Sequence, residues 1–148
     1  MKKYIIITTV LIIIIILSIS IYKFILPTYA DVYSLNGDYI PSIRTVLKDT
    51  RVVKKYSLSK KNNVIFKKYE YGYQENVIED LKTYTNYLIQ MEQFEALKTY
   101  DLSDINNSSI YLGKKSHIDE DFIILVNIEY TSSNYTISVS KKKGTIIN

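Results

Sequence analysis

Apolar and polar residues alternate with a period of two in two segments near the C-terminus. Residues 122–130 and 135–140 both show this alternation, which is typical of strands with one buried face. The polar residues 131–134 separate them and predict a hairpin, in which 122–130 is a central strand. Residues 51–58 and 64–71 are also rich in β-forming residues, and they predict a second hairpin across the polar stretch 59–63.

The period changes in the middle of the chain. From Val77 to Met91, apolar residues recur every three or four positions and would line one face of a helix. Asn76, followed three residues later by Glu79, predicts a capping box at its start. We expect the helix to end near Gln93 and to pack its apolar side on a sheet.

Two weaker strands are predicted at residues 95–100 and 110–114. The predicted order of elements is therefore β-β-α-β-β-β-β. One helix against a mainly antiparallel sheet is an α+β fold, and we expect one small domain of this class.

The longest apolar run opens the chain. Residues 5–22 carry no charge, are mostly Ile and follow Lys2 and Lys3. As a helix, residues 4–26 would reach about 34 Å, enough to cross the hydrocarbon core of a bilayer. Pro27 would end that helix. Cleavage after Ala30 is the alternative and would release a secreted protein, but the long apolar core favours a retained anchor.

The lysines before this run predict a cytoplasmic N-terminus by the positive-inside rule. We expect residues 1–3 in the cytoplasm and residues 4–26 in the membrane as a transmembrane helix or uncleaved signal anchor. Residues 27–39 would form a juxtamembrane linker, and residues 40–148 an extracytoplasmic domain. The lipid bilayer is then a partner through residues 4–26, and the protein is a single-pass protein of the cell membrane.

The net charge of +4 comes largely from the predicted anchor. Of the 19 Lys and Arg residues, Lys2, Lys3 and Lys23 belong to it, which leaves 16 against 15 acidic residues. A domain so nearly neutral gives no reason to expect nucleic acid as a partner. Residues 44–68 are nevertheless strongly basic. They could face anionic headgroups or wall teichoic acids, or their lysines could simply keep strand edges soluble.

Few residues of the chain are candidates for catalysis or metal binding. The chain has no Cys, so disulfides and thiolate metal sites are excluded. The single His117 lies among carboxylates in a predicted loop, and the oxygen-rich segment 101–108 has Ser109 and Lys115 where a calcium loop needs Gly and Glu. No glycine-rich phosphate loop or Gly-x-Ser-x-Gly motif is present. We predict no catalytic, cofactor-binding or metal-binding residues and no enzyme, although a hydrolase that uses a carboxylate pair stays open.

Tyr69, Tyr71 and Tyr73 alternate, so they would share one face of a continued strand. If exposed, they could stack on sugar rings or pack on a partner protein, with Lys54 and Lys67 as neighbouring cations. If buried, they are core residues beneath the helix. These five residues are the candidate binding surface.

The segments 40–46, 79–84 and 124–130 resemble small, uncharacterised extracytoplasmic proteins of clostridia and related low-GC Gram-positive bacteria. Those proteins carry an anchor or lipid signal followed by one such domain. The resemblance implies a membrane-anchored envelope protein and supplies no functional residues. We expect a binding or accessory module whose partner is another membrane protein or an envelope polymer. The alternatives are a small carboxylate-dependent hydrolase and a sensor or inhibitor domain of a membrane partner.

Overall fold

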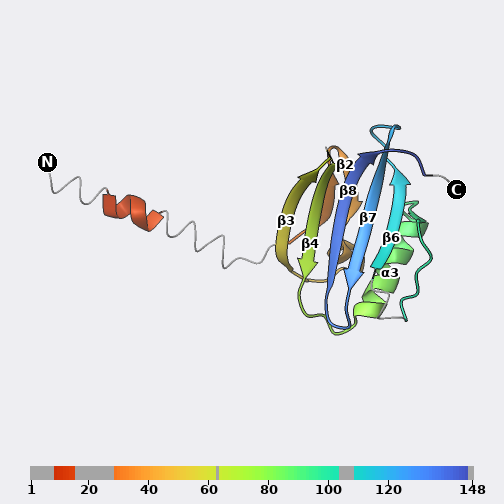
Figure 1. Ribbon diagram of the computed structural model, residues 1–148. Helices are drawn as coiled ribbons and strands as arrows, with labels where there is room; N and C mark the ends of the chain where they lie inside the picture. Colours follow the sequence, from red (N-terminus) through yellow and green to blue (C-terminus); the bar gives the residue numbers. More distant parts are fainter. Residues whose placement is uncertain (1–8, 16–28, 63, 104–108, 147–148) are drawn as a thin grey trace.

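The computed structural model describes residues 9–15, 29–62, 64–103 and 109–146 (Figure 1). Residues 9–15 are helical. In these described ranges, no helix is both long enough and apolar enough to cross a membrane. Most of the predicted span of residues 4–26 lies outside the described residues.

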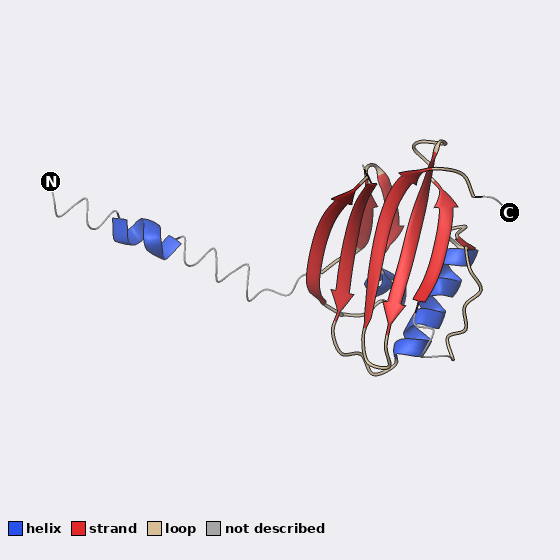
Figure 2. Ribbon diagram, viewed as in Figure 1, coloured by secondary structure: helices blue, strands red, loops and turns tan. Residues whose placement is uncertain are grey.

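A six-stranded antiparallel sheet forms one layer of the domain, and α3 (Val77–Gln90) lies behind it in Figure 2. From β3 onward, the elements follow the predicted order β-β-α-β-β-β-β, and the α+β class is confirmed. The strands lie in the order β3 (Val53–Lys61), β4 (Val64–Tyr71), β8 (Tyr135–Lys143), β7 (Phe122–Tyr130), β6 (Ser109–Lys115) and β5 (Glu95–Ala96).

The core lies between the sheet and the elements behind it. We call the face of the sheet toward α3 the inner face and the opposite one the open face. On the inner face, β7 and β8 contribute Val126, Ile128, Ile137 and Val139, which are all buried. The helix adds a buried stripe to the same cluster, consisting of Val77, Leu81, Tyr84, Thr85 and Leu88.

A two-stranded hairpin covers a further part of the inner face. It consists of β1 (Val32–Leu35) and β2 (Asp38–Pro41) and lies against β8. Its residues Tyr33 and Ile40 are fully buried, so the folded domain begins before residue 40, within the stretch expected as a linker. Asn36 and Gly37 both have positive φ, at 46° and 93°, as a tight hairpin turn between two strands requires.

A short helix, α2 (Ile43–Leu47), follows the hairpin in a segment for which no helix was predicted. The Ser42 side chain caps it by accepting a hydrogen bond from the Thr45 N–H at 3.2 Å. Five residues are too few to show a helical period, which is why the pattern of apolar residues did not predict it.

The main helix differs from its prediction at both ends. It ends at Gln90 rather than near Gln93, and Asn76 makes no side-chain hydrogen bond at its start. The predicted capping box with Glu79 is therefore wrong. Backbone dihedrals of −123° and 51° place Asn76 outside the extended conformation that a capping residue normally adopts.

The burial of the β1–β2 hairpin predicts where the domain can be truncated. A chain that starts at residue 29 should unfold cooperatively in urea. A chain that starts at residue 40 should show a much weaker transition or none. It lacks Tyr33 and Leu35, and each large buried side chain contributes about 1.5–3 kcal/mol to a total stability of about 5–15 kcal/mol. If the two chains were equally stable, residues 29–39 would act only as a linker.

Candidate functional site

The predicted binding surface does not exist as one surface. Tyr69 and Tyr71 belong to the core with exposed fractions of 8% and 1%, whereas Tyr73 is 76% exposed. Tyr73 lies beyond the end of β4, so the alternation that would align it with the other two no longer applies. Lys54 is exposed, and Lys67 is half-buried beside a pocket of about 280 Å³.

The buried tyrosines join the hairpin to the sheet. The Tyr33 and Tyr71 hydroxyl groups are 2.8 Å apart and share a hydrogen bond. The Tyr33 ring also packs on Tyr69, with ring centroids 4.4 Å apart. Burial raises the pKa of Tyr71 to about 12 and that of Tyr33 well above its usual value. Both hydroxyls are therefore neutral structural groups.

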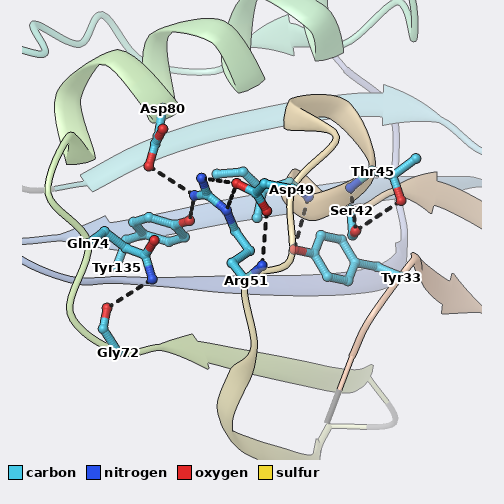
Figure 3. Close-up of polar contacts among 10 residues, drawn as sticks. Tyr33, Ser42, Thr45, Asp49, Arg51, Gly72, Gln74, Asp80 and Tyr135 are labelled. Carbon is cyan, nitrogen blue, oxygen red and sulfur yellow. Dashed lines mark hydrogen bonds and ion pairs between the residues drawn. The ribbon is translucent and has the colours of Figure 1, made fainter. Parts of the chain in front are cut away.

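Arg51 forms a largely buried polar cluster at the start of β3 (Figure 3). Its guanidinium group pairs with Asp49 and, at 2.9 Å, with Asp80 of α3, and it donates a hydrogen bond to the Tyr135 hydroxyl. Burial alone would raise the pKa of Asp49, but the hydrogen bonds from Arg51 outweigh it and lower that pKa. The cluster therefore holds Asp49 in its ionised form.

Asp38 forms a second buried cluster at the turn of the β1–β2 hairpin. Its carboxylate contacts Lys141 Nζ at 2.7 Å and accepts hydrogen bonds from Ser116 Oγ at 2.6 Å and His117 N at 3.0 Å. Burial would raise the pKa of Asp38, but these contacts outweigh it and lower the pKa. His117 takes part through its backbone only, and the residue itself is exposed.

Lys114 is the third buried cation of the domain. Its side chain is 5% exposed, and its Nζ lies 3.0 Å from a carboxylate oxygen of Glu92 and 4.8 Å from the centre of the Phe94 ring. A pocket of about 420 Å³ opens beside it. This cation, like those of Arg51 and Lys141, is already neutralised by a carboxylate.

Three exposed lysines lie in a line at one end of the open face. Two of them, Lys142 of β8 and Lys115 of β6, are both cross-strand partners of Ile123 in β7. They therefore lie in one line across the three strands. Lys61 of β3 lies at the same end of this face, opposite Val64 of β4. No carboxylate of the described residues lies within ion-pair distance of these three lysines. We call Lys61, Lys142 and Lys115 the lysine row.

The pleat of the sheet creates this row by separating neighbouring lysines. Lys114 and Lys115 are adjacent on β6, and Lys141 and Lys142 are adjacent on β8. Successive side chains of a strand point to opposite faces, so one lysine of each pair enters the core side and the other reaches solvent. Members of the row on alternate strands are about 10 Å apart by the usual strand spacing. Such a line of cations suits a ligand with repeated negative charges.

The oxygen-rich segment and the single histidine form no described metal centre. Within the described residues, no group of three or more His, Asp or Glu side chains converges as metal ligands. Asp101 accepts hydrogen bonds from the N–H and hydroxyl groups of Ser103, which is an ordinary turn contact. Residues 104–108 of the predicted turn lie outside the described residues.

Comparisons with protein-family models, curated proteins and solved structures found no match to this chain.

The Asp38 cluster predicts a pH-dependent contribution to stability. Because its pKa is lower in the folded protein than the unfolded value of about 3.9, the contribution is present above that value and is lost as the pH falls through the folded pKa. Asp38→Asn should cost about 3 kcal/mol at pH 7, since Lys141 would remain buried without its partner. It should also flatten the loss of stability below pH 4.

Urea unfolding at pH 7 and pH 3 would measure both effects. Asp121→Asn is the matched control, because Asp121 forms an exposed pair with Lys143 at 3.6 Å. Its effect should stay within about 0.5 kcal/mol. If the two variants were equally stable at pH 7, the Asp38 cluster would not stabilise the hairpin.

Proposed function

We propose that the chain is a membrane-anchored, non-catalytic binding module of the cell envelope that holds a linear polyanion on its lysine row. The observation that carries this proposal is the contrast between paired and unpaired cations. The buried Lys114 and Lys141 each have a carboxylate partner, whereas Lys61, Lys115 and Lys142 have none among the described residues.

The open face gives a long ligand room to bind. No described helix covers this face, which lies toward the viewer in Figure 1. Next to the lysine row, the face carries the uncharged, half-buried side chains of Phe66 and Leu125, which lie on one line across the strands with the buried Ser140 between them. A polyol phosphate of the wall, such as a teichoic acid, presents to such a surface both its repeated phosphates and the C–H groups of the polyol units between them.

The position of the N-terminal connection also supports a ligand away from the bilayer. Tyr29 and Asp31 lie at the open end of the β1–β2 hairpin, where the Asp31 carbonyl accepts a hydrogen bond from Ser42 N. The lysine row lies level with the other end, since Asp38 at the turn binds Lys141 next to Lys142. If residues 4–26 anchor the chain, the row points away from that membrane and toward the wall.

Neither Asp38 nor Asp49 is suited to act as the general acid of a hydrolase. A glycosidase that uses two carboxylates needs one of them to stay protonated until it donates its proton. Asp38 and Asp49 have lowered pKa values because cations and hydrogen-bond donors contact them. Both are therefore held as anions at neutral pH.

The lysine row predicts salt-dependent binding of polyanions. Full-length protein in an uncharged detergent should bind long-chain polyphosphate, and inorganic phosphate should bind far more weakly because it meets only one lysine. By comparison with nucleic-acid phosphates, each lysine contributes about 0.7–0.9 to the slope of log affinity against log salt. Lys115→Gln/Lys142→Gln should therefore lower that slope by about 1.5.

Calorimetric titration at several salt concentrations would measure this slope. The control is Lys48→Gln/Lys82→Gln, which removes the same charge from exposed positions on the opposite side of the sheet. If both double variants changed the slope equally, binding would depend on net charge and not on the lysine row.

Cell fractionation tests the anchor. The full-length chain should stay in the membrane fraction after washes with high salt and with alkali. Protease added to intact protoplasts should digest residues of the domain, because the domain would lie outside the membrane. A shorter product in the medium that begins near Asp31 would instead support the secreted alternative, and a full-length chain in the cytosol would contradict both.

A further inference from the structure

The structure also contains a sheet edge, nine residues long, that no other described strand covers. β3 runs from Val53 to Lys61 at the end of the sheet and pairs only with β4 among the described strands (Figure 1). All its residues after Val53 are exposed. At the other edge, β5 and the Leu97 N–H, which donates to the Tyr111 carbonyl, partly cover β6. We propose that β3 accepts an added strand from an acidic, extended segment of another protein.

The backbone of β3 carries the first part of this proposal. In an antiparallel pair, alternate residues of an edge strand direct their N–H and C=O groups away from the neighbouring strand. A bulge interrupts pairing between Val53 and Lys55, but the ladder is regular from Lys55 to Lys61. These seven residues present a regular edge that an extended peptide can complete with main-chain hydrogen bonds. A polyol phosphate cannot do this, because it has no peptide backbone.

The side chains of β3 define the chemistry of the partner. Lys54 and Lys55 lie at one end and Lys60 and Lys61 at the other, all exposed and without a described ion pair. Between them, Tyr56 and Leu58 are 47% and 61% exposed on the inner face. A matching strand therefore has carboxylates at both ends and apolar or β-branched residues between them.

A second copy of this chain fits the edge poorly. In the antiparallel registers centred on Ser57–Leu58, Lys54 or Lys55 of one copy lies opposite Lys60 or Lys61 of the other. Like charges directly opposite each other destabilise a strand pair. The arrangement thus opposes self-pairing and favours an acidic partner of different sequence.

A designed peptide would test strand addition to the full-length protein in an uncharged detergent. The probe is capped Glu-Glu-Thr-Val-Thr-Val-Glu-Glu. Its two controls carry N-methyl groups on one or the other set of alternate residues. N-methylation keeps the charges of the peptide but removes backbone N–H donors. The control that is methylated on the N–H groups facing β3 should therefore bind at least about tenfold more weakly than the parent peptide. Hydrogen exchange of β3 amides should slow when the parent peptide binds.

Charge reversal gives a second, independent measurement. The variant Lys55→Glu/Lys60→Glu should no longer bind the acidic peptide, and it should bind the corresponding peptide that has Lys in place of Glu. Equal binding of the parent and both N-methylated peptides, or unchanged exchange of β3 amides, would overturn strand addition. Self-association of the chain that excludes the peptide would also overturn it.

This inference rests on the proposed binding module but concerns a site that shares only Lys61 with the lysine row. The charge-reversed variant retains Lys115 and Lys142, so polyphosphate titration of the same sample reports separately on the lysine row. Loss of peptide binding with retained polyphosphate binding would leave the function proposed above intact.

Discussion

The domain depends on covering one face of a wide sheet. Six strands present more apolar surface than α3 can bury, and an uncovered inner face would expose Ile137, Val139 and their neighbours to water. The β1–β2 hairpin and α2 extend the cover, and only the edge strand β3 keeps Tyr56 and Leu58 exposed on this face among the described strands. The Asp38–Lys141 contact fixes the turn of that hairpin against β8 at a distance of 2.7 Å. This requirement explains why the folded domain begins well before residue 40.

The same one-sided burial sorts the charges of the domain. A lysine that becomes buried on the inner side needs a partner, because an unpaired buried cation is very costly. Lys114 and Lys141 meet this condition through Glu92 and Asp38. Their neighbours Lys115 and Lys142 emerge on the open face, where solvent stabilises the charge and no partner is needed. Exposed lysines on that face are therefore available to a ligand at no cost to the core.

The strong periodic patterns predicted their elements well, because burial imposes those patterns directly. The strands β7 and β8 and the helix α3 follow from the spacing of apolar residues. The β1–β2 hairpin is only four residues on each side, and its Asn36-Gly37 turn lies in a stretch that resembles a linker. The lysine row could not be predicted in this way. It requires the order of strands in the sheet, which neighbouring residues do not specify.

The two proposed surfaces use different groups of the same protein. The lysine row offers side-chain charges on the open face, so it can hold a ligand with suitably spaced anions. The edge of β3 offers backbone donors and acceptors in a fixed register, so it requires another polypeptide. Lys61 belongs to both surfaces, and a polyanion bound there would screen one of the four lysines that flank the edge. Occupancy of the row should therefore weaken, but not abolish, the attraction of an acidic strand to β3.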